Sequence, residues 1–490
     1  MILNATLERP AEPEQQQPEL PSASLTSTAV LAAASAAVLL ALFAAGAGSI
    51  LRLAYPALTV LIAVNLLLKR PVLYLQFTLW IWFVTPFVRR MVDYRAGWAE
   101  PNLTLLAPLL ASGISIITIL RPGVKEKTSI FPFALCGGAV LYGLIVGLFL
   151  HPSMEVVYGL FNWGSPILLG YHVATQWKSY PQHRSALFST FAWGTLVLSA
   201  YGIYQFFTAP EWDNYWLQNI TQGLIDPSFG TPEPMGYRIW STMNSAGPFA
   251  NLLVAGLLLL LIAPQRGKSI FTVAGFLALL LTVVRTAWLT WIIGLVILLK
   301  GVRAKVMLKS MSTLIFIGLA LIPLAASPLL GPFLQQRFST FNHLGRDESF
   351  NERQDMYATL IKKVESDPFG HGLRNQEVIG NLVVDSGILT MLFSLGWLGT
   401  AFYLTGVGWF ILHKTQRAED DTFAWTAKVI CIAFLAQIIG SNLFVGSTGT
   451  FFWTFAGVAL AAERWNQDHV PPTPARRSPL RPANRVAPIA

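Results

Sequence analysis

Residues 277–300 read LALLLTVVRTAWLTWIIGLVILLK, and Arg285 is the only charged residue in this run before Lys300 closes it. The run is long enough to cross a bilayer, because a helix that rises 1.5 Å per residue needs about 20 apolar residues to do so. An arginine inside hydrocarbon costs about 2.5 to 3.5 kcal/mol on insertion scales, so such arginines lie at the membrane interface, line a wet cavity or serve a function. The position of Arg285 therefore depends on how the rest of the chain crosses the membrane.

The rest of the chain has the composition of a membrane protein. Of its 490 residues, 53% are hydrophobic and 12% are charged, whereas about 25% of the residues of soluble proteins are charged. The net charge of +9 does not indicate nucleic-acid binding, because the basic residues cluster in short links between apolar runs, as the positive-inside rule describes. Cys136 and Cys431 fall inside apolar runs, which favours small buried side chains over disulfides or zinc ligands.

These features predict an all-α polytopic membrane protein of about 12 to 14 transmembrane helices, with both termini in the cytoplasm. Residues 1–27, rich in Pro, Gln and Glu, are predicted to be a disordered cytoplasmic tail, residues 28–463 the transmembrane domain, and residues 464–490 a basic cytoplasmic tail. The predicted helices span residues 28–48, 52–68, 72–88, 103–120, 129–150, 154–173, 185–207, 245–263, 268–284, 286–300, 306–327, 386–412, 424–445 and 448–463.

Two segments on the extracytoplasmic side, the outer loops 208–244 and 328–385, are much longer than the other links. Loops of this length are usually functional or disordered, and the aromatic and apolar residues in both favour order. In the second loop, Ser349 and Glu352 have the spacing of a capping box, and apolar residues at helical spacing follow as far as Val364. This pattern predicts a helix of about 15 residues on the membrane surface that ends before DPFGHG.

Three arginines from separate segments fall on the extracytoplasmic side: Arg238 in GYRIWSTMN, Arg285, and Arg353 in the second outer loop. Arginine presents a planar fork of donors that suits bidentate phosphate binding, and it stays charged in a partly apolar site. Snorkelling, or an ion pair with a nearby acid such as Asp347, is the alternative for each. We predict that these arginines bind the phosphate or diphosphate head of a substrate in the outer leaflet.

Four segments carry a resemblance to a known family: RIWSTMNSAGPFANLLVAGLLLLL from Arg238, VVRTAWLTWIIGLVILLK around Arg285, NERQDMYATLIKKVESDPFGHGL from Asn351, and NLVVDSGILTMLFSLGWLGTAF from Asn381. Their order, with the long outer loop between them, resembles the O-antigen ligase and O-antigen polymerase superfamily over about 238–410. The amino-terminal helices are similar to the family only in hydropathy. The resemblance implies a lipid-donor (GT-C-like) glycosyltransferase fold in the bacterial inner membrane, with the active site facing the periplasm.

The resemblance also implies the reaction. It is glycosyl transfer without metal or cofactor, from an undecaprenyl-diphosphate-linked glycan donor to an acceptor of the same kind, which polymerises repeat units into an exopolysaccharide or O-antigen. The arginines would bind the diphosphate and stabilise charge as it leaves. The bilayer, a chain-length regulator and a flippase of the same pathway are the implied partners. The alternative within the family is a ligase that transfers the glycan to lipid A core.

The catalytic base is where this chain departs from the family. Ligases carry a His-Asn pair near the end of the long loop, whereas this chain has GNLVVDSG, with Gly380 or Asp385 where the histidine would align. We predict Asp385 as the base that takes the proton from the acceptor hydroxyl; it could also be the N-cap of the helix that follows. His371, in PFGHGL, is the alternative catalytic residue. The missing histidine favours a polymerase over a ligase.

Two further functions stay open. A secondary transporter would place acids at broken helices; Trp163, Gly164 and Pro166 could break one helix, but the predicted spans are almost free of acids. A metal-dependent transferase would need paired acids in an early outer loop, where DYRAGWAE supplies Asp93 and Glu100. Neighbouring arginines offer an ordinary salt-bridge explanation for that pair.

Overall fold

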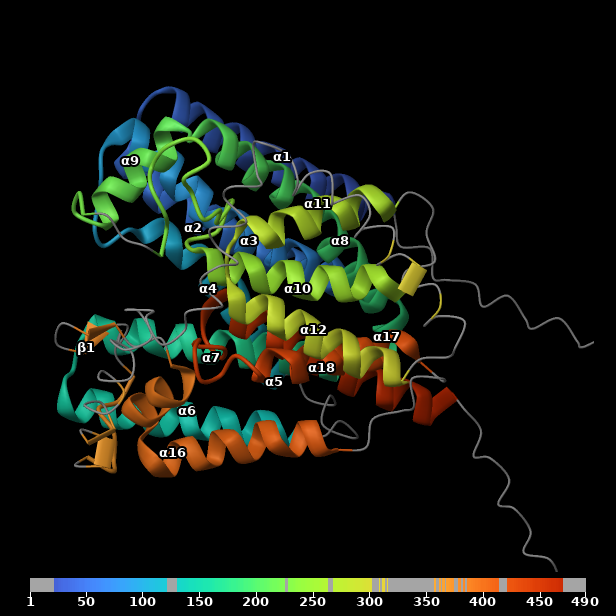
Figure 1. The fold of residues 1–490 in the computed structure, drawn as a ribbon. Helices are drawn as coiled ribbons and strands as arrows, with labels where there is room; N and C mark the ends of the chain where they lie inside the picture. Colours follow the sequence, from blue (N-terminus) through green and yellow to red (C-terminus); the bar gives the residue numbers. More distant parts are fainter. Residues whose placement is uncertain are drawn as a thin grey trace, which may run out of the picture.

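The computed structural model of the chain describes residues 22–120, 130–224, 228–262, 268–301, 367–373, 386–413 and 421–469, together with scattered residues between 308 and 383. Most of its helices run roughly along one direction and form an elongated bundle (Figure 1). The short helix α9 and strand β1 lie at one end of this bundle, on the left of the view. We call this end the α9 end.

The described helices and strands lie in the following order along the chain. The α-helices are α1 (Ser22–Ala44), α2 (Gly48–Lys69), α3 (Pro71–Ala96), α4 (Leu106–Gly113), α5 (Ile117–Leu120), α6 (Phe131–Leu150), α7 (Met154–Thr175), α8 (Tyr180–Thr208), α9 (Glu211–Ile220), α10 (Ala246–Ile262), α11 (Lys268–Leu281), α12 (Arg285–Gly301), α16 (Gly387–Leu412), α17 (Thr422–Leu435) and α18 (Gly446–His469). The 3-10 helices are η1 (Leu103–Leu105), η2 (Ile114–Ile116) and η4 (Trp177–Ser179). An antiparallel pair of two-residue strands is formed by β1 (Val378–Ile379) and β2 (Leu382–Val383).

The prediction of an all-α polytopic membrane protein is confirmed by these helices. Six helical stretches of the described chain are long and apolar enough to cross a membrane: Gly48–Lys69, Pro71–Ala96, Leu103–Leu120, Phe131–Leu150, Trp177–Thr208 and Gly387–Leu412. Shorter apolar helices accompany them: Val30–Ala44, Ala246–Ile262, Ser269–Leu281 and Thr422–Leu435. The chain is therefore a multipass membrane protein.

Several predicted helix ends are wrong. α1 begins at Ser22 and not at 28, α8 begins at Tyr180 and not at 185, and α18 ends at His469 and not at 463. The helix predicted at 424–445 ends at Leu435, because the amides of Ala436 and Gln437 bond to oxygens three residues back, which tightens and closes the last turn. The helix predicted at 72–88 continues as α3 to Ala96. This extension places a group of charged side chains on the last turns of α3.

The helix predicted at 154–173 is confirmed, and the break that Trp163, Gly164 and Pro166 could have introduced does not occur. α7 runs without interruption from Met154 to Thr175 with Pro166 inside it. The centre of α7 packs closely on α18: a Cβ added to Gly457 would lie 2.2 Å from the main-chain oxygen of Gly170. Small residues at such crossings let membrane helices approach closely. The glycines of α7 and α18 therefore allow these two helices to pack against each other.

The described parts of the two outer loops are ordered. The first contains α9, whose Trp216 and Leu217 pack with Tyr237 and Trp240 in a small aromatic core. In the second, Tyr357, Ile361, Lys362, Val364 and Glu365 are helical. The capping box at 349–352 and the helix predicted at 306–327 lie outside the described residues, apart from single helical positions in the latter.

Both cysteines are buried and free, as predicted. Cys136 donates to the main-chain oxygen of Tyr403 at 3.3 Å, and Cys431 donates to that of Phe452 at 3.4 Å. They serve as small core residues between helices.

Candidate functional site

Arg285 is the first residue of α12 and follows the turn 282–284 that connects α11 to it. Thr282 Oγ1 donates to the main-chain oxygen of Leu279 at 2.7 Å, and Val283 adopts a positive φ of 54°. The Arg285 side chain is half-buried. Arg285 therefore lies where two apolar helices end, and not at the centre of a membrane span.

Arg238 lies against this same turn. Its Nη2 donates to the main-chain oxygen of Val283 at 3.2 Å, and its Nε points at that of Thr282 at 3.4 Å. The amide of Ile239 donates to the main-chain oxygen of Leu281 at 3.3 Å. The structure thus brings the segment that carries Arg238 to the turn that directly precedes Arg285.

Residues 237–242, which we call the strap, are held at the α9 end by side-chain hydrogen bonds. Tyr237 donates its hydroxyl to Asn214 of α9. Burial, with the nearby Asp213 carboxylate, raises the pKa of Tyr237, so its phenol keeps its proton. Ser241 Oγ donates to the main-chain oxygen of Leu198 in α8 at 2.6 Å. The strap is therefore fixed to both helices.

A buried charged network lies behind the strap. Arg90 of α3 pairs with Asp213 of α9 at 2.6 Å, and Gln205 of α8 donates to the other carboxylate oxygen at 2.7 Å. Their side chains are 1%, 0% and 0% exposed. We call Arg90, Gln205 and Asp213 the buried triad. The triad was not predicted from the sequence, because Arg90 and Asp213 are 123 positions apart. The residues around each of them do not indicate that the two side chains form a pair.

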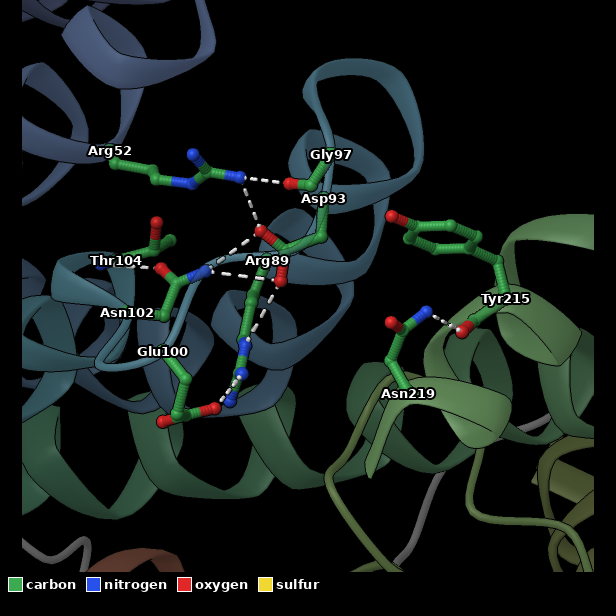
Figure 2. A network of polar contacts seen from close by, with 9 residues as sticks. All are labelled: Arg52, Arg89, Asp93, Gly97, Glu100, Asn102, Thr104, Tyr215 and Asn219. Atoms are coloured by element: carbon green, nitrogen blue, oxygen red, sulfur yellow. Dashed lines mark hydrogen bonds and ion pairs between the residues drawn. The ribbon is translucent and has the colours of Figure 1, made fainter. Parts of the chain in front are cut away.

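A second network lies beside the first and is drawn in Figure 2. Asp93 accepts from Arg52 at 2.8 Å and from Arg89 at 3.3 Å, and Arg89 reaches Glu100 at 2.7 Å. Asn102 also donates to Asp93 at 2.9 Å. The salt-bridge interpretation of Asp93 and Glu100 is confirmed, because both carboxylates form ion pairs with arginine side chains. This network joins α2, α3 and the loop after α3.

His371 is placed by α6 and α16. Its amide donates to the main-chain oxygen of Phe393 at 2.6 Å, and its ring Nε2 lies 3.6 Å from Asp367. The segment PFGHGL packs tightly between α6 and α16: a Cβ on Gly372 would lie 2.1 Å from the Cα of Gly147. The contacts of His371 come from these elements, whereas Arg238 and Arg285 are placed by the turn between α11 and α12.

Two predicted site residues, Arg353 and Asp385, lie outside the described residues. The alternative role of Asp385 as the N-cap of the following helix is wrong. α16 begins at Gly387, and its N-cap is Ser386, whose side chain accepts from the amide of Leu389 at 3.4 Å. A capping role therefore does not account for an acid at position 385.

Comparison with known protein families covers part of this region. Residues 270–404 match the family model described as O-Antigen ligase. No curated protein matches the chain. The matched segment includes Arg285 and His371 and ends inside α16, whereas Arg238 and the strap precede it. The match confirms the resemblance found in the sequence and supports a membrane glycosyltransferase of the O-antigen ligase and polymerase type.

Proposed function

We propose that the protein polymerises undecaprenyl-diphosphate-linked oligosaccharide repeat units at the periplasmic face of the bacterial inner membrane. The α9 end then faces the periplasm. The observation that carries this proposal is the contact of Arg238 with the carbonyls of the turn that precedes Arg285. This contact brings the segment of Arg238 to the turn that directly precedes Arg285, between two apolar helices.

Helix stability does not explain an arginine at the start of α12. A cation at a helix N-terminus is opposed by the helix dipole, by about 0.3 to 1 kcal/mol. A bound anion reverses this sign, because both the guanidinium and the dipole then attract it. A diphosphate at the membrane surface is such an anion. Arg353, which precedes His371 in the same long loop, is proposed as the third arginine that binds the diphosphate. We call Arg238, Arg285 and Arg353 the diphosphate cradle.

The chemistry follows from the charges. The acceptor hydroxyl attacks the anomeric carbon of the donor sugar, and the bond from that carbon to the diphosphate oxygen breaks. Arg238, Arg285 and Arg353 would stabilise the negative charge that grows on the leaving diphosphate, which is electrostatic stabilisation of the transition state. A base must accept the hydroxyl proton. Asp385 is the proposed base, and His371, whose ring lies near Asp367, is the alternative.

A ligase that transfers the glycan to lipid A core uses the same donor, so the two activities differ in the acceptor. The absence of the ligase His-Asn pair in GNLVVDSG favours the polymerase. A transporter is less well supported, because the helix that could have been broken at Trp163 and Pro166 is continuous.

The experiment uses purified protein in nanodiscs with a lipid-diphosphate-linked repeat unit, EDTA and no nucleotide, and follows the products by gel and mass spectrometry. A ladder of lipid-linked oligomers is expected. Transfer only when lipid A core is supplied would establish the ligase, and no product with either acceptor would overturn glycosyl transfer.

A further inference from the structure

We propose that the buried triad is a positioning device that fixes the strap and so holds Arg238 against the start of α12. The inference rests on the proposed function for its activity measurement, but the placement of Arg238 can be tested without it. The three residues come from α3, α8 and α9 and meet only in the folded bundle.

Each member of the triad that contacts the strap does so through the main chain of the strap. Arg90 Nη2 donates to the main-chain oxygen of Ser241 at 2.5 Å. Gln205 Oε1 accepts from the amides of Trp240 and Ser241 at 3.1 Å and 3.0 Å. The triad therefore sets the path of the strap through hydrogen bonds to its main chain.

Asp213 organises the other two residues. One carboxylate oxygen pairs with Arg90, and the other accepts from Gln205 and, at 2.9 Å, from the hydroxyl of Tyr201. The bond from Gln205 Nε2 to Asp213 turns the amide so that its oxygen faces the strap. Asp213 thus acts through Gln205 and Arg90, without contacting the strap main chain itself.

The strap needs this support because its backbone is strained. Ser241 has a positive φ of 55°, a conformation that non-glycine residues hold only where surrounding contacts impose it. Its amide and carbonyl are both bound by the triad, and its hydroxyl is bound by α8. Three residues before Ser241, Arg238 reaches the turn 282–284, so a shift at Ser241 would move the guanidinium.

Stability alone is a poor reason for such a network. Replacing a buried ion pair with apolar residues of similar volume is often neutral or stabilising, because both charges lose their hydration. A positioning role explains why Arg90 and Asp213 are buried, because the guanidinium of Arg90 binds the Asp213 carboxylate and the main-chain oxygen of Ser241 at the same time. Lysine cannot make both contacts in the same geometry.

Arg90→Lys tests the proposal, with Arg89→Lys as the matched control. Both arginines lie on the same turn of α3 and are 1% and 4% exposed, but Arg89 pairs with Asp93 and Glu100. Full-length protein in nanodiscs is treated with trypsin, and cleavage between Arg238 and Ile239 is followed by mass spectrometry. Polymer formation is measured at saturating donor and expressed per monodisperse protein.

In Arg90→Lys we expect cleavage after Arg238 to be about tenfold faster than in the wild type, because cleavage follows the population of the opened segment. We expect kcat to fall by a similar factor, about tenfold, while the KM for the lipid-linked unit changes less. Arg89→Lys should leave both within about twofold. Asp213→Asn, which keeps the shape of the carboxylate but removes its charge, should behave like Arg90→Lys.

Equal cleavage rates in Arg90→Lys and Arg89→Lys would overturn the placement. Faster cleavage of Arg90→Lys with an unchanged kcat would show that release of the strap does not affect polymer formation. That result would overturn the positioning role. A wild-type protein that forms no polymer, yet shows the predicted difference in cleavage, would leave the placement standing and remove the proposed function.

Discussion

Arg238 donates from Nη2 to the main-chain oxygen of Val283 at 3.2 Å, two residues before the arginine that opens α12. Val283 is β-branched and has a positive φ of 54°, which is rare for such a residue. A guanidinium fork that binds the carbonyls on this turn helps to hold that conformation. The segments that carry Arg238 and Arg285 therefore meet at the turn 282–284, although 47 positions separate the two arginines in the sequence.

Arg285→Ala should abolish polymer formation while leaving membrane insertion and yield unchanged. The side chain lies at a helix start, where its charge opposes the helix dipole, so its removal does not weaken α12. The measurement is the product ladder from equal amounts of purified variant and wild type. Lys300→Ala, at the other end of α12, is the matched control and should retain activity. Polymer of normal length and yield from Arg285→Ala would show that Arg285 is not needed to bind the diphosphate.

Arg238→Lys should lower kcat/KM by about tenfold or more, because lysine keeps the charge but loses the planar fork that reaches both carbonyls of the turn. The variant should also bind lipid diphosphate less tightly in a direct titration. A lysine variant with wild-type kcat/KM would mean that charge alone suffices and that the contact with the turn is incidental.

Asp385→Asn and Ser386→Ala separate catalysis from helix capping at adjacent positions. Because Ser386 is the N-cap of α16, Ser386→Ala should lower the free energy of unfolding by about 0.5 to 2 kcal/mol and keep activity per folded molecule. Asp385→Asn should do the reverse, with loss of polymer and little change in Tm. If the asparagine variant is active, Asp385 is not the base, and His371→Gln becomes the variant to test.

The sequence was sufficient to predict most of the long apolar helices and the position of Arg285 between two of them. Long apolar runs and basic links determine where a chain crosses a membrane, and these signals are local. α10 and α12 were predicted as 245–263 and 286–300 and are observed as Ala246–Ile262 and Arg285–Gly301. The turn between α11 and α12 followed from the same signals.

The buried triad could not be predicted, because its members look ordinary in their local context. Arg90 follows an apolar run, where an arginine usually snorkels to the interface, and Asp213 falls in the first outer loop, as predicted from the sequence. Only tertiary packing brings them within 2.6 Å. The N-cap of α16 was missed for a smaller reason, since Asp385 and Ser386 are both good capping residues and the helix begins one residue later than predicted.

Gly396→Ala and Gly408→Ala should shift stability in opposite directions although both glycines lie in α16. Gly396 has φ 62° and ψ −174° at the kink of the helix, a region that only glycine occupies readily. An added Cβ there would lie 2.4 Å from the main-chain oxygen of Phe369, beside His371. Gly408 has nothing within 4 Å of its Cβ position, so alanine there should stabilise the helix by about 0.5 to 1 kcal/mol.

We expect Gly396→Ala to lower the free energy of unfolding by more than about 2 kcal/mol. Thermal unfolding in one detergent compares the two variants with the wild type. Because the kink seats the segment that contains His371, Gly396→Ala should also make the peptide bonds around His371 more accessible to protease, which Gly408→Ala should not do. Equal Tm values for both variants would contradict the packing of PFGHGL against the kink, since a Cβ can be accommodated at Gly396 only if that segment lies elsewhere.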